Sequence, residues 1–182
     1  MNAKKKQKAR LIFKSRELSQ IFLVDREFIE KTADALPLKN KTVLEIGAGT
    51  GILTQALARR AKRVIALEID SRLREQLLKR VKEFNNVEVN FVDARKFNFA
   101  GFKTVFGNLP YHASTPLLFK ILESGFEEAV LCLQKEFAER LVARPGSRDW
   151  SRLSVAAQAN ADVKILFEIP RFAFTPVPKV DS

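Results

Sequence analysis

The chain has 182 residues, of which 46% are hydrophobic and 29% are charged, a composition typical of a globular domain and not of a disordered chain. It contains no apolar run long enough to span a membrane and no apolar segment of the kind a secretion signal needs, so we expect a cytoplasmic protein without membrane contact. The 32 Lys and Arg residues against 21 Asp and Glu give a net charge of +11, which favours nucleic acid as a partner. The single cysteine, Cys132, excludes an internal disulfide, and with one histidine in the chain it excludes a Cys/His zinc cluster. We therefore expect no metal site and interpret Cys132 as a buried structural thiol.

Positive charge is densest in residues 1–16, which we interpret as a basic N-terminal arm ahead of a folded domain at residues 17–182. Seven cations precede the first acidic residue: Lys4, Lys5, Lys6, Lys8, Arg10, Lys14 and Arg16. Such an arm favours contact with phosphates, and the alternative is a disordered, solubilising tail.

Strand and helix patterns alternate along the rest of the chain. Helices are predicted at residues 26–36 (with Asp25 as N-cap), 52–58, 71–83 (capped by Ser71), 116–123 (capped by Ser114 or Thr115), 135–143 and 152–161. Strands are predicted at residues 42–46, 63–70, 87–93, 104–106, 129–133 and 163–169, followed by an extended, proline-stiffened loop at residues 172–178. This alternation predicts a Rossmann-like α/β fold, with a doubly wound, mainly parallel sheet and helices on both faces.

A glycine-rich turn follows the first buried strand. Gly47, Gly49 and Gly51 stand at alternate positions between an apolar run and a helical pattern. Glycine tolerates positive φ and lets the backbone lie against a ligand, so a nucleotide-like molecule could sit at this strand end. The G-x-G-x-G spacing differs from the G-x-G-x-x-G of dinucleotide enzymes, and a tight strand-to-helix turn without a ligand is the alternative.

Two carboxylates end the next strands of the predicted sheet. Glu68 stands about twenty residues beyond the glycines, where a βαβ unit places a carboxylate beside a ribose. Asp93 could face a purine amino group at the same edge. The alternatives are a solvated strand end for Glu68 and an ordinary helix cap for Asp93.

Asn108, Leu109, Pro110 and Tyr111 follow the fourth predicted strand. The Asn108 side-chain oxygen and the Leu109 carbonyl could both accept from a nucleobase amino group, while Pro110 stiffens the turn and Tyr111 offers a ring for stacking. Without other signals, such a tetrapeptide is better explained by a structural turn closed by a buried asparagine.

These motifs, in this order, resemble those of the class I S-adenosylmethionine-dependent methyltransferases that act on adenine N6. Further segments narrow the resemblance to the ribosomal RNA small-subunit adenine N6,N6-dimethyltransferases. They are Gln20-Ile-Phe-Leu23, Ser114-Thr-Pro116, Gln134-Lys-Glu-Phe-Ala-Glu-Arg140, Pro145-Gly146, Arg152-Leu-Ser154 and Phe174-Thr-Pro-Val-Pro-Lys-Val-Asp-Ser182. The resemblance covers about residues 15–182.

The resemblance implies a role for each matching residue. The cofactor S-adenosyl-L-methionine, which leaves as S-adenosyl-L-homocysteine, would be held by Gln20, Leu23, Gly47, Ala48, Gly49, Gly51, Glu68, Ile69, Asp93, Ala94 and Asn108. The catalytic set would be Asn108, Leu109, Pro110, Tyr111 and Phe174, with the two rings sandwiching the target adenine. The implied partner is small-subunit ribosomal RNA in a pre-30S-type particle, modified at two adjacent adenines near its 3′ end during ribosome biogenesis, and we expect a monomeric enzyme.

Two departures from the family accompany these implications. His112 follows Tyr111 where the family often has asparagine or glutamine, and we interpret it as a loop residue that lines the pocket. The family continues after Ser182 into a last sheet strand and a small helical domain, so we expect an open sheet edge here. Two other functions stay open: a large-subunit ribosomal RNA adenine dimethyltransferase, and a non-catalytic RNA-binding assembly factor.

Overall fold

The centre of the molecule is a five-stranded sheet in which every pairing is parallel. The computed structural model describes residues 20–110 and 113–182, so the predicted basic arm, Tyr111 and His112 lie outside the described residues. In spatial order the strands are β4 (Val87–Phe91), β3 (Arg63–Glu68), β2 (Thr42–Ile46), β5 (Thr104–Asn108) and β6 (Glu128–Cys132). The glycine-bearing strand β2 is therefore central, and β6 is an edge.

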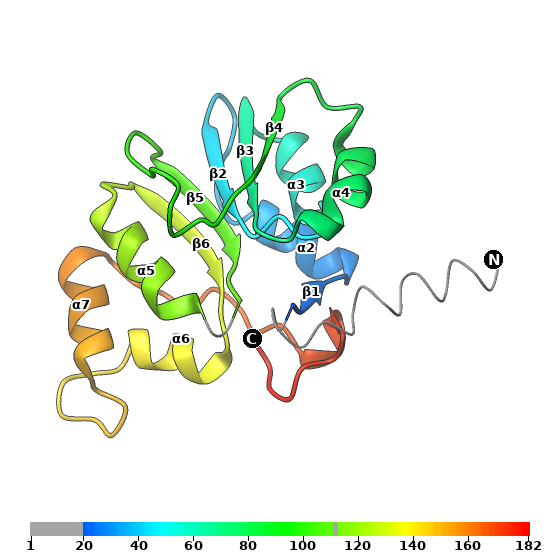
Figure 1. Ribbon diagram of the computed structural model, residues 1–182. Helices are drawn as coiled ribbons and strands as arrows, with labels where there is room; N and C mark the ends of the chain where they lie inside the picture. Colours follow the sequence, from blue (N-terminus) through cyan, green and yellow to red (C-terminus); the bar gives the residue numbers. More distant parts are fainter. Residues whose placement is uncertain (1–19, 111–112) are drawn as a thin grey trace.

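Helices cover both faces of this sheet, as the sequence predicts (Figure 1). One face packs against α2 (Arg26–Ala33), α3 (Ile52–Ala58) and α4 (Arg74–Val81). The other packs against α5 (Ser114–Glu123), α6 (Lys135–Leu141) and α7 (Arg152–Asn160). The doubly wound α/β architecture is confirmed.

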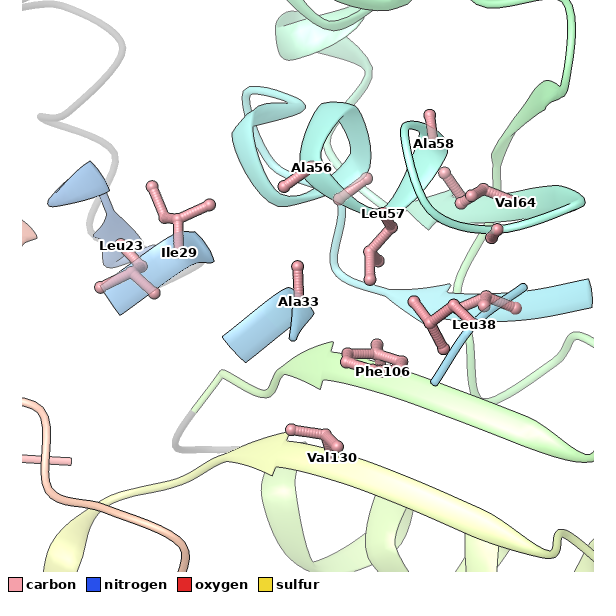
Figure 2. Packing of buried hydrophobic residues seen from close by; sticks show 14 of the residues in the cluster. Leu23, Ile29, Ala33, Leu38, Ala56, Leu57, Ala58, Val64, Phe106 and Val130 are labelled. Carbon is pink, nitrogen blue, oxygen red and sulfur yellow. The ribbon is translucent and has the colours of Figure 1, made fainter. Parts of the chain in front are cut away.

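The core forms because the central strands are apolar on both sides. In β2, Val43 belongs to the cluster under α2 and α3, whereas Leu44 and Ile46 belong to the cluster under α5 and α7. Figure 2 shows the first cluster, with Leu57 of α3 and Phe106 of β5 among its buried side chains. Residues buried on both faces fix the sheet and thereby the positions of its strand ends.

Local capping signals were predicted with mixed success. Asp25 caps α2, since its carboxylate accepts from the backbone N–H groups of Glu27 and Phe28. The prediction of Ser71 as a cap is wrong, because the Asp70 side chain accepts from Arg72 N and starts a 3-10 turn, η1 (Ser71–Leu73), ahead of α4. The predicted caps of α5 are also wrong: its N-cap is Ala113, which has no side-chain acceptor.

The predicted strand at residues 163–169 is absent. The segment is extended, but its only backbone hydrogen bonds within the described residues join Ile169 to Ser182. The β propensity of this segment is real, yet a strand needs a hydrogen-bonded neighbour, and β6 pairs only with β5. The space between β6 and residues 163–169 is an open groove.

A second, two-stranded sheet lies beside the first. Antiparallel β1 (Phe22–Leu23) pairs with β7 (Phe174–Thr175), which follows a 3-10 turn, η3 (Arg171–Ala173). The sequence prediction of a plain extended loop at residues 172–178 missed this pairing. Within the described residues, no helix combines the length and apolarity needed to span a bilayer.

Candidate functional site

A cavity of about 170 Å³ lies at the carboxyl ends of β2, β3 and β5 and is also bordered by β1. Parallel strands end at one edge of a sheet, which is why side chains from distant parts of the sequence meet there. Twelve of the residues predicted for the site line the cavity: Gln20, Leu23, Gly47, Ala48, Gly49, Glu68, Ile69, Asp93, Ala94, Asn108, Leu109 and Pro110.

The glycine turn brings backbone to the cavity surface. Gly49 has φ +57°, and a Cβ built on it would lie 2.9 Å from the Phe22 ring. Gly51, with φ +82°, is the N-cap of α3 and does not line the cavity; a Cβ there would lie 2.6 Å from Leu77. A side chain at Gly49 would collide with Phe22 at the cavity wall, whereas Gly51 allows α3 to pack closely against α4.

Glu68 is a buried carboxylate that already accepts two backbone hydrogen bonds. Its two oxygens accept from the backbone N–H groups of Gly49, at 2.6 Å, and Asp70, at 2.8 Å. Burial raises the pKa of Glu68 above its ordinary value, and those two N–H groups act in the opposite direction. Each carboxylate oxygen has a second lone pair, so Glu68 can still accept from ligand hydroxyls.

Asp93 and Ile69 form the far side of the cavity. The Asp93 carboxylate binds its neighbour Arg95 through Arg95 N, Nε and Nη2, and this pairing lowers the pKa of Asp93. The bond from Arg95 N closes a local turn, as the alternative interpretation of Asp93 as a cap predicts. A ligand amino group would therefore have to share the Asp93 carboxylate with Arg95. Ile69 is 48% exposed and offers an apolar surface at the same rim.

Asn108 has a defined orientation at the end of β5. Its side-chain Nδ2 donates to the Ile21 carbonyl at 3.2 Å, which leaves Oδ1 as an acceptor for a ligand. The next residue is anchored through Leu109 N, which donates to the Cys132 carbonyl at 3.2 Å, while the Leu109 carbonyl accepts no hydrogen bond from any described residue. Among the described residues, neither Asn108 Oδ1 nor the Leu109 carbonyl therefore has a hydrogen-bond donor at this edge of the cavity.

Gln20 and Leu23 enter the site from the segment before α2. The pKa of Asp70 is lowered chiefly by its bond to Arg72 and also by the nearby Gln20 side chain, and Leu23 is held in β1 by its pairing with Phe174. This pairing buries Phe174, which is 1% exposed and does not line the cavity. Stacking of a base on Phe174 stays a prediction that requires its ring to become accessible. Phe172, by contrast, is 73% exposed and was not singled out by the sequence motifs.

Glu45 is a second buried acid, one that the sequence motifs did not assign to the site. It lies in β2, 1% exposed, and neither of its carboxylate oxygens has a hydrogen-bond partner in the described part of the chain. Burial raises the pKa of Glu45 to about 7; the nearby Thr54 hydroxyl lowers it, without a hydrogen bond of normal geometry, and the charge of Glu68 raises it further. An uncharged Glu45 is the form that tolerates this environment.

Among the cavity residues that were not predicted for the site, Phe22, Arg95 and Thr50 were missed for different reasons. Phe22 packs against Gly49, a contact that exists only because β1 folds back onto the glycine turn. Arg95 lines the cavity through its bond to Asp93, which the D-x-R spacing could have suggested. Thr50 sits inside the glycine motif and could have been included with it.

The chain matches a known protein family along most of its length. A family model described as "Ribosomal RNA adenine dimethylase" matches residues 13–182. A protein of Thermococcus sibiricus named as a probable ribosomal RNA small subunit methyltransferase A is 47% identical over 167 residues, which cover 91% of this chain and 61% of that relative. A Methanococcus maripaludis protein of the same name is 44% identical over 171 residues, covering 92% and 65%. The chain thus spans less than two thirds of these relatives' length.

Two solved structures of RNA methyltransferases are also similar to this chain. A dimethyladenosine transferase from Plasmodium falciparum has a TM-score of 0.82 and 40% identity, covering 88% of this chain and 60% of that one. The 23S ribosomal RNA methyltransferase ErmE has a TM-score of 0.76 and 32% identity, covering 88% and 66%. The fold is thus the class I methyltransferase fold expected from the sequence. The chain belongs to the ribosomal RNA adenine dimethylase family.

Proposed function

We propose that this protein uses S-adenosyl-L-methionine to dimethylate N6 of two adjacent adenines near the 3′ end of small-subunit ribosomal RNA. The family, the names of the relatives and the polar groups of the cavity support this function. The net charge of +11 suits an RNA partner, because Lys and Arg neutralise phosphates.

The orientation of Asn108 is the observation that carries the proposal. An exocyclic adenine amine is a poor nucleophile because its lone pair is delocalised into the ring. Asn108 Oδ1 and the Leu109 carbonyl are two acceptors with no described partner, so together they can hold both amine hydrogens and localise the lone pair toward an electrophile. Positioning of this kind accounts for a large share of catalysis when no side chain has to remove a proton first.

The residues around the cavity fit the cofactor. The Gly49 backbone leaves a cradle that a Cβ would fill, Glu68 has lone pairs for two ribose hydroxyls, and Ile69 offers an apolar face for the adenine ring. Gln20 and Leu23 would close the methionine end. When bound, S-adenosyl-L-methionine supplies a methyl group on a positively charged sulfur.

Transfer to the correct ribosomal subunit tests this proposal. Purified protein is incubated with radiolabelled cofactor and either unmethylated small subunits or large subunits, and RNA from each is digested and analysed for N6-methylated adenosine. We expect label as dimethyladenosine in small-subunit RNA. Label confined to large-subunit RNA would establish the alternative enzyme, and RNA binding without label would establish a non-catalytic assembly factor.

A further inference from the structure

The carboxylate of Asp93 already has a cation as its partner at the wall of the cavity. Arg95 donates to it through its backbone N at 2.9 Å, through Nε at 3.0 Å to each oxygen, and through Nη2 at 2.7 Å. A carboxylate has about four lone-pair directions, and these contacts with Arg95 use all of them. The two oxygens therefore have no acceptor position left for a further donor.

The position of this pair makes it relevant to ligand binding. Asp93 and Arg95 both line the cavity, in the segment that follows β4. β4 forms the edge of the sheet opposite β6, whereas the last residues of the chain bond to Ile169 and to Lys135, just after β6. The pair thus lies away from the point where the chain ends.

A second pair of the same kind lies outside the cavity. Asp70 and Arg72 follow β3, and Arg72 donates to the Asp70 carboxylate through N, Nε and Nη2 in the same way. Neither of these two residues lines the cavity, and the Asp70 side chain is 3% exposed. The same local bonds therefore serve only the start of η1 after β3, but hold a carboxylate at a ligand cavity after β4.

The Arg95 side chain can leave Asp93 without movement of the backbone. It is 56% exposed, so water can hydrate the guanidinium when the carboxylate is released. The backbone of Arg95 is held separately, because Lys120 Nζ donates to the Arg95 carbonyl at 2.5 Å and lies 4.7 Å from the centroid of the Phe99 ring. The guanidinium is therefore the movable part of the pair.

We propose that the Arg95 guanidinium occupies the Asp93 carboxylate in the ligand-free protein and must give up at least one of these bonds before the adenine amino group of S-adenosyl-L-methionine can bind there. This inference rests on the proposed function, because that function supplies the cofactor. An amino group donates hydrogen bonds, so it competes with the guanidinium for the same oxygens. Arg95 is thus a specificity-determining residue, which lowers the affinity for the cofactor and the advantage that the amino group gives it.

Calorimetric titration of the 182-residue chain with S-adenosyl-L-homocysteine measures this competition. Arg95→Ala removes the guanidinium and retains the backbone bond to Asp93, so we expect the variant to bind about two- to fivefold more tightly than the parent protein. Arg72→Ala removes the same charge from the pair outside the cavity and should bind like the parent. Unchanged or weaker binding in Arg95→Ala, or equal tightening in Arg72→Ala, would overturn the proposal.

A second ligand separates release of Asp93 from a general effect of charge or bulk. The probe is an analogue of S-adenosyl-L-homocysteine that carries purine, with hydrogen where adenine has its amino group. This analogue has no donor that competes with Arg95, so Arg95→Ala should leave its affinity unchanged. Equal tightening of both ligands would show that Asp93 is not the group released, and the proposal would fail.

NMR spectroscopy detects the release itself. A guanidinium Nε–H that is held by a carboxylate gives a distinct proton–nitrogen signal, and the signal of Arg95 is the one that is absent from Arg95→Ala. We expect it in the ligand-free parent protein, with a change on saturation with S-adenosyl-L-homocysteine and a smaller change with the purine analogue. An unchanged signal in the saturated parent would overturn this inference and leave the proposed function intact. Failure of S-adenosyl-L-homocysteine to bind either the parent or Arg95→Ala would overturn both.

Discussion

The cavity beside the glycine turn and the groove beside β6 differ in which groups of their walls lack a partner among the described residues. At the carboxyl ends of β2 and β5, these groups are single polar atoms, such as Asn108 Oδ1 and the Leu109 carbonyl. Along β6, they are whole peptide edges beside apolar side chains. The first arrangement suits a small molecule held at a few points, whereas the second is an open sheet edge. The comparison shows that volume alone does not identify a candidate site, since the larger hollow is the one that lacks the polar groups predicted for the site.

The largest expected effect comes from removing an acceptor in the catalytic cavity. Asn108→Ala should lower the rate of methyl transfer about 100- to 1,000-fold, because the amine loses a group that orients its lone pair. Binding of RNA should persist. Asn85→Ala, in the exposed turn before β4, is the matched control. Single-turnover assays with labelled cofactor measure the rate, and an unchanged rate in Asn108→Ala would refute the clamping role.

The next largest effect is expected from the buried acid Glu45, on the pH dependence of the free energy of unfolding. Glu45 has an ordinary pKa of 4.5 and a folded-state pKa of about 7, so the folded protein holds this proton more tightly than the unfolded chain. Its contribution to stability is complete below pH 4.5 and is lost as the pH rises through 7. Between pH 5 and 8 the free energy of unfolding should fall by about 2 to 3 kcal/mol from this group.

Glu45→Gln tests this dependence, because the amide cannot ionise. Urea unfolding at pH 5 and pH 8 should show a smaller loss of stability in the variant than in the parent protein. Glu88→Gln is the control: hydrogen bonds from Asn90 and Arg63 lower the pKa of Glu88, so this side chain is ionised across the whole interval. Equal pH dependence in Glu45→Gln and the parent would show that Glu45 titrates normally.

A pair of glycine variants separates backbone strain from cofactor contact. Gly49→Ala and Gly125→Ala both place a side chain at positive φ, +57° and +73°, and each should cost about 1 to 2 kcal/mol of stability. Only at Gly49 would the new Cβ meet a neighbour, 2.9 Å from the Phe22 ring, while Gly125 has open space. Calorimetric titration with S-adenosyl-L-homocysteine should show about tenfold weaker binding for Gly49→Ala alone. Equal affinities of Gly49→Ala and the parent protein for S-adenosyl-L-homocysteine would show that Gly49 does not contribute to cofactor binding.

The smallest effect is expected at Leu166, on the wall of the open groove between β6 and residues 163–169. Leu166→Ser should change the free energy of unfolding by less than about 0.5 kcal/mol, because the side chain is 58% exposed. Leu44→Ala, at a position that is 0% exposed, should cost about 2 to 5 kcal/mol. Chemical denaturation compares the two. A large cost at Leu166 would mean that this wall already contributes to the core.

The sequence predicted those features that depend on local pattern or on the common edge of a parallel sheet. Asp25 caps α2 as expected, and Gly49, Glu68 and Asn108 meet because each ends or follows a buried strand. The absent strand at residues 163–169 could not be foreseen from its own residues, since pairing depends on a neighbour elsewhere.

Long-range contacts account for what the sequence missed at the site itself. The burial of Phe174 follows from the two-residue pairing of β7 with β1, which is too short to show a pattern. Arg95 binds the carboxylate of Asp93; the D-x-R spacing makes this pairing possible, but it does not show that Arg95 binds there in the folded chain.

Under the proposed function, the bond from Asn108 to the Ile21 carbonyl would also determine which nucleobase is rejected. With its nitrogen turned away, the amide shows the target only an acceptor, and the neighbouring Leu109 carbonyl is a second one. Guanine has a keto oxygen where adenine has its amino group. The lone pairs of that oxygen would repel those of Asn108 Oδ1 and the Leu109 carbonyl. Discrimination between the two purines would therefore come from electrostatic mismatch, before any methyl group moves.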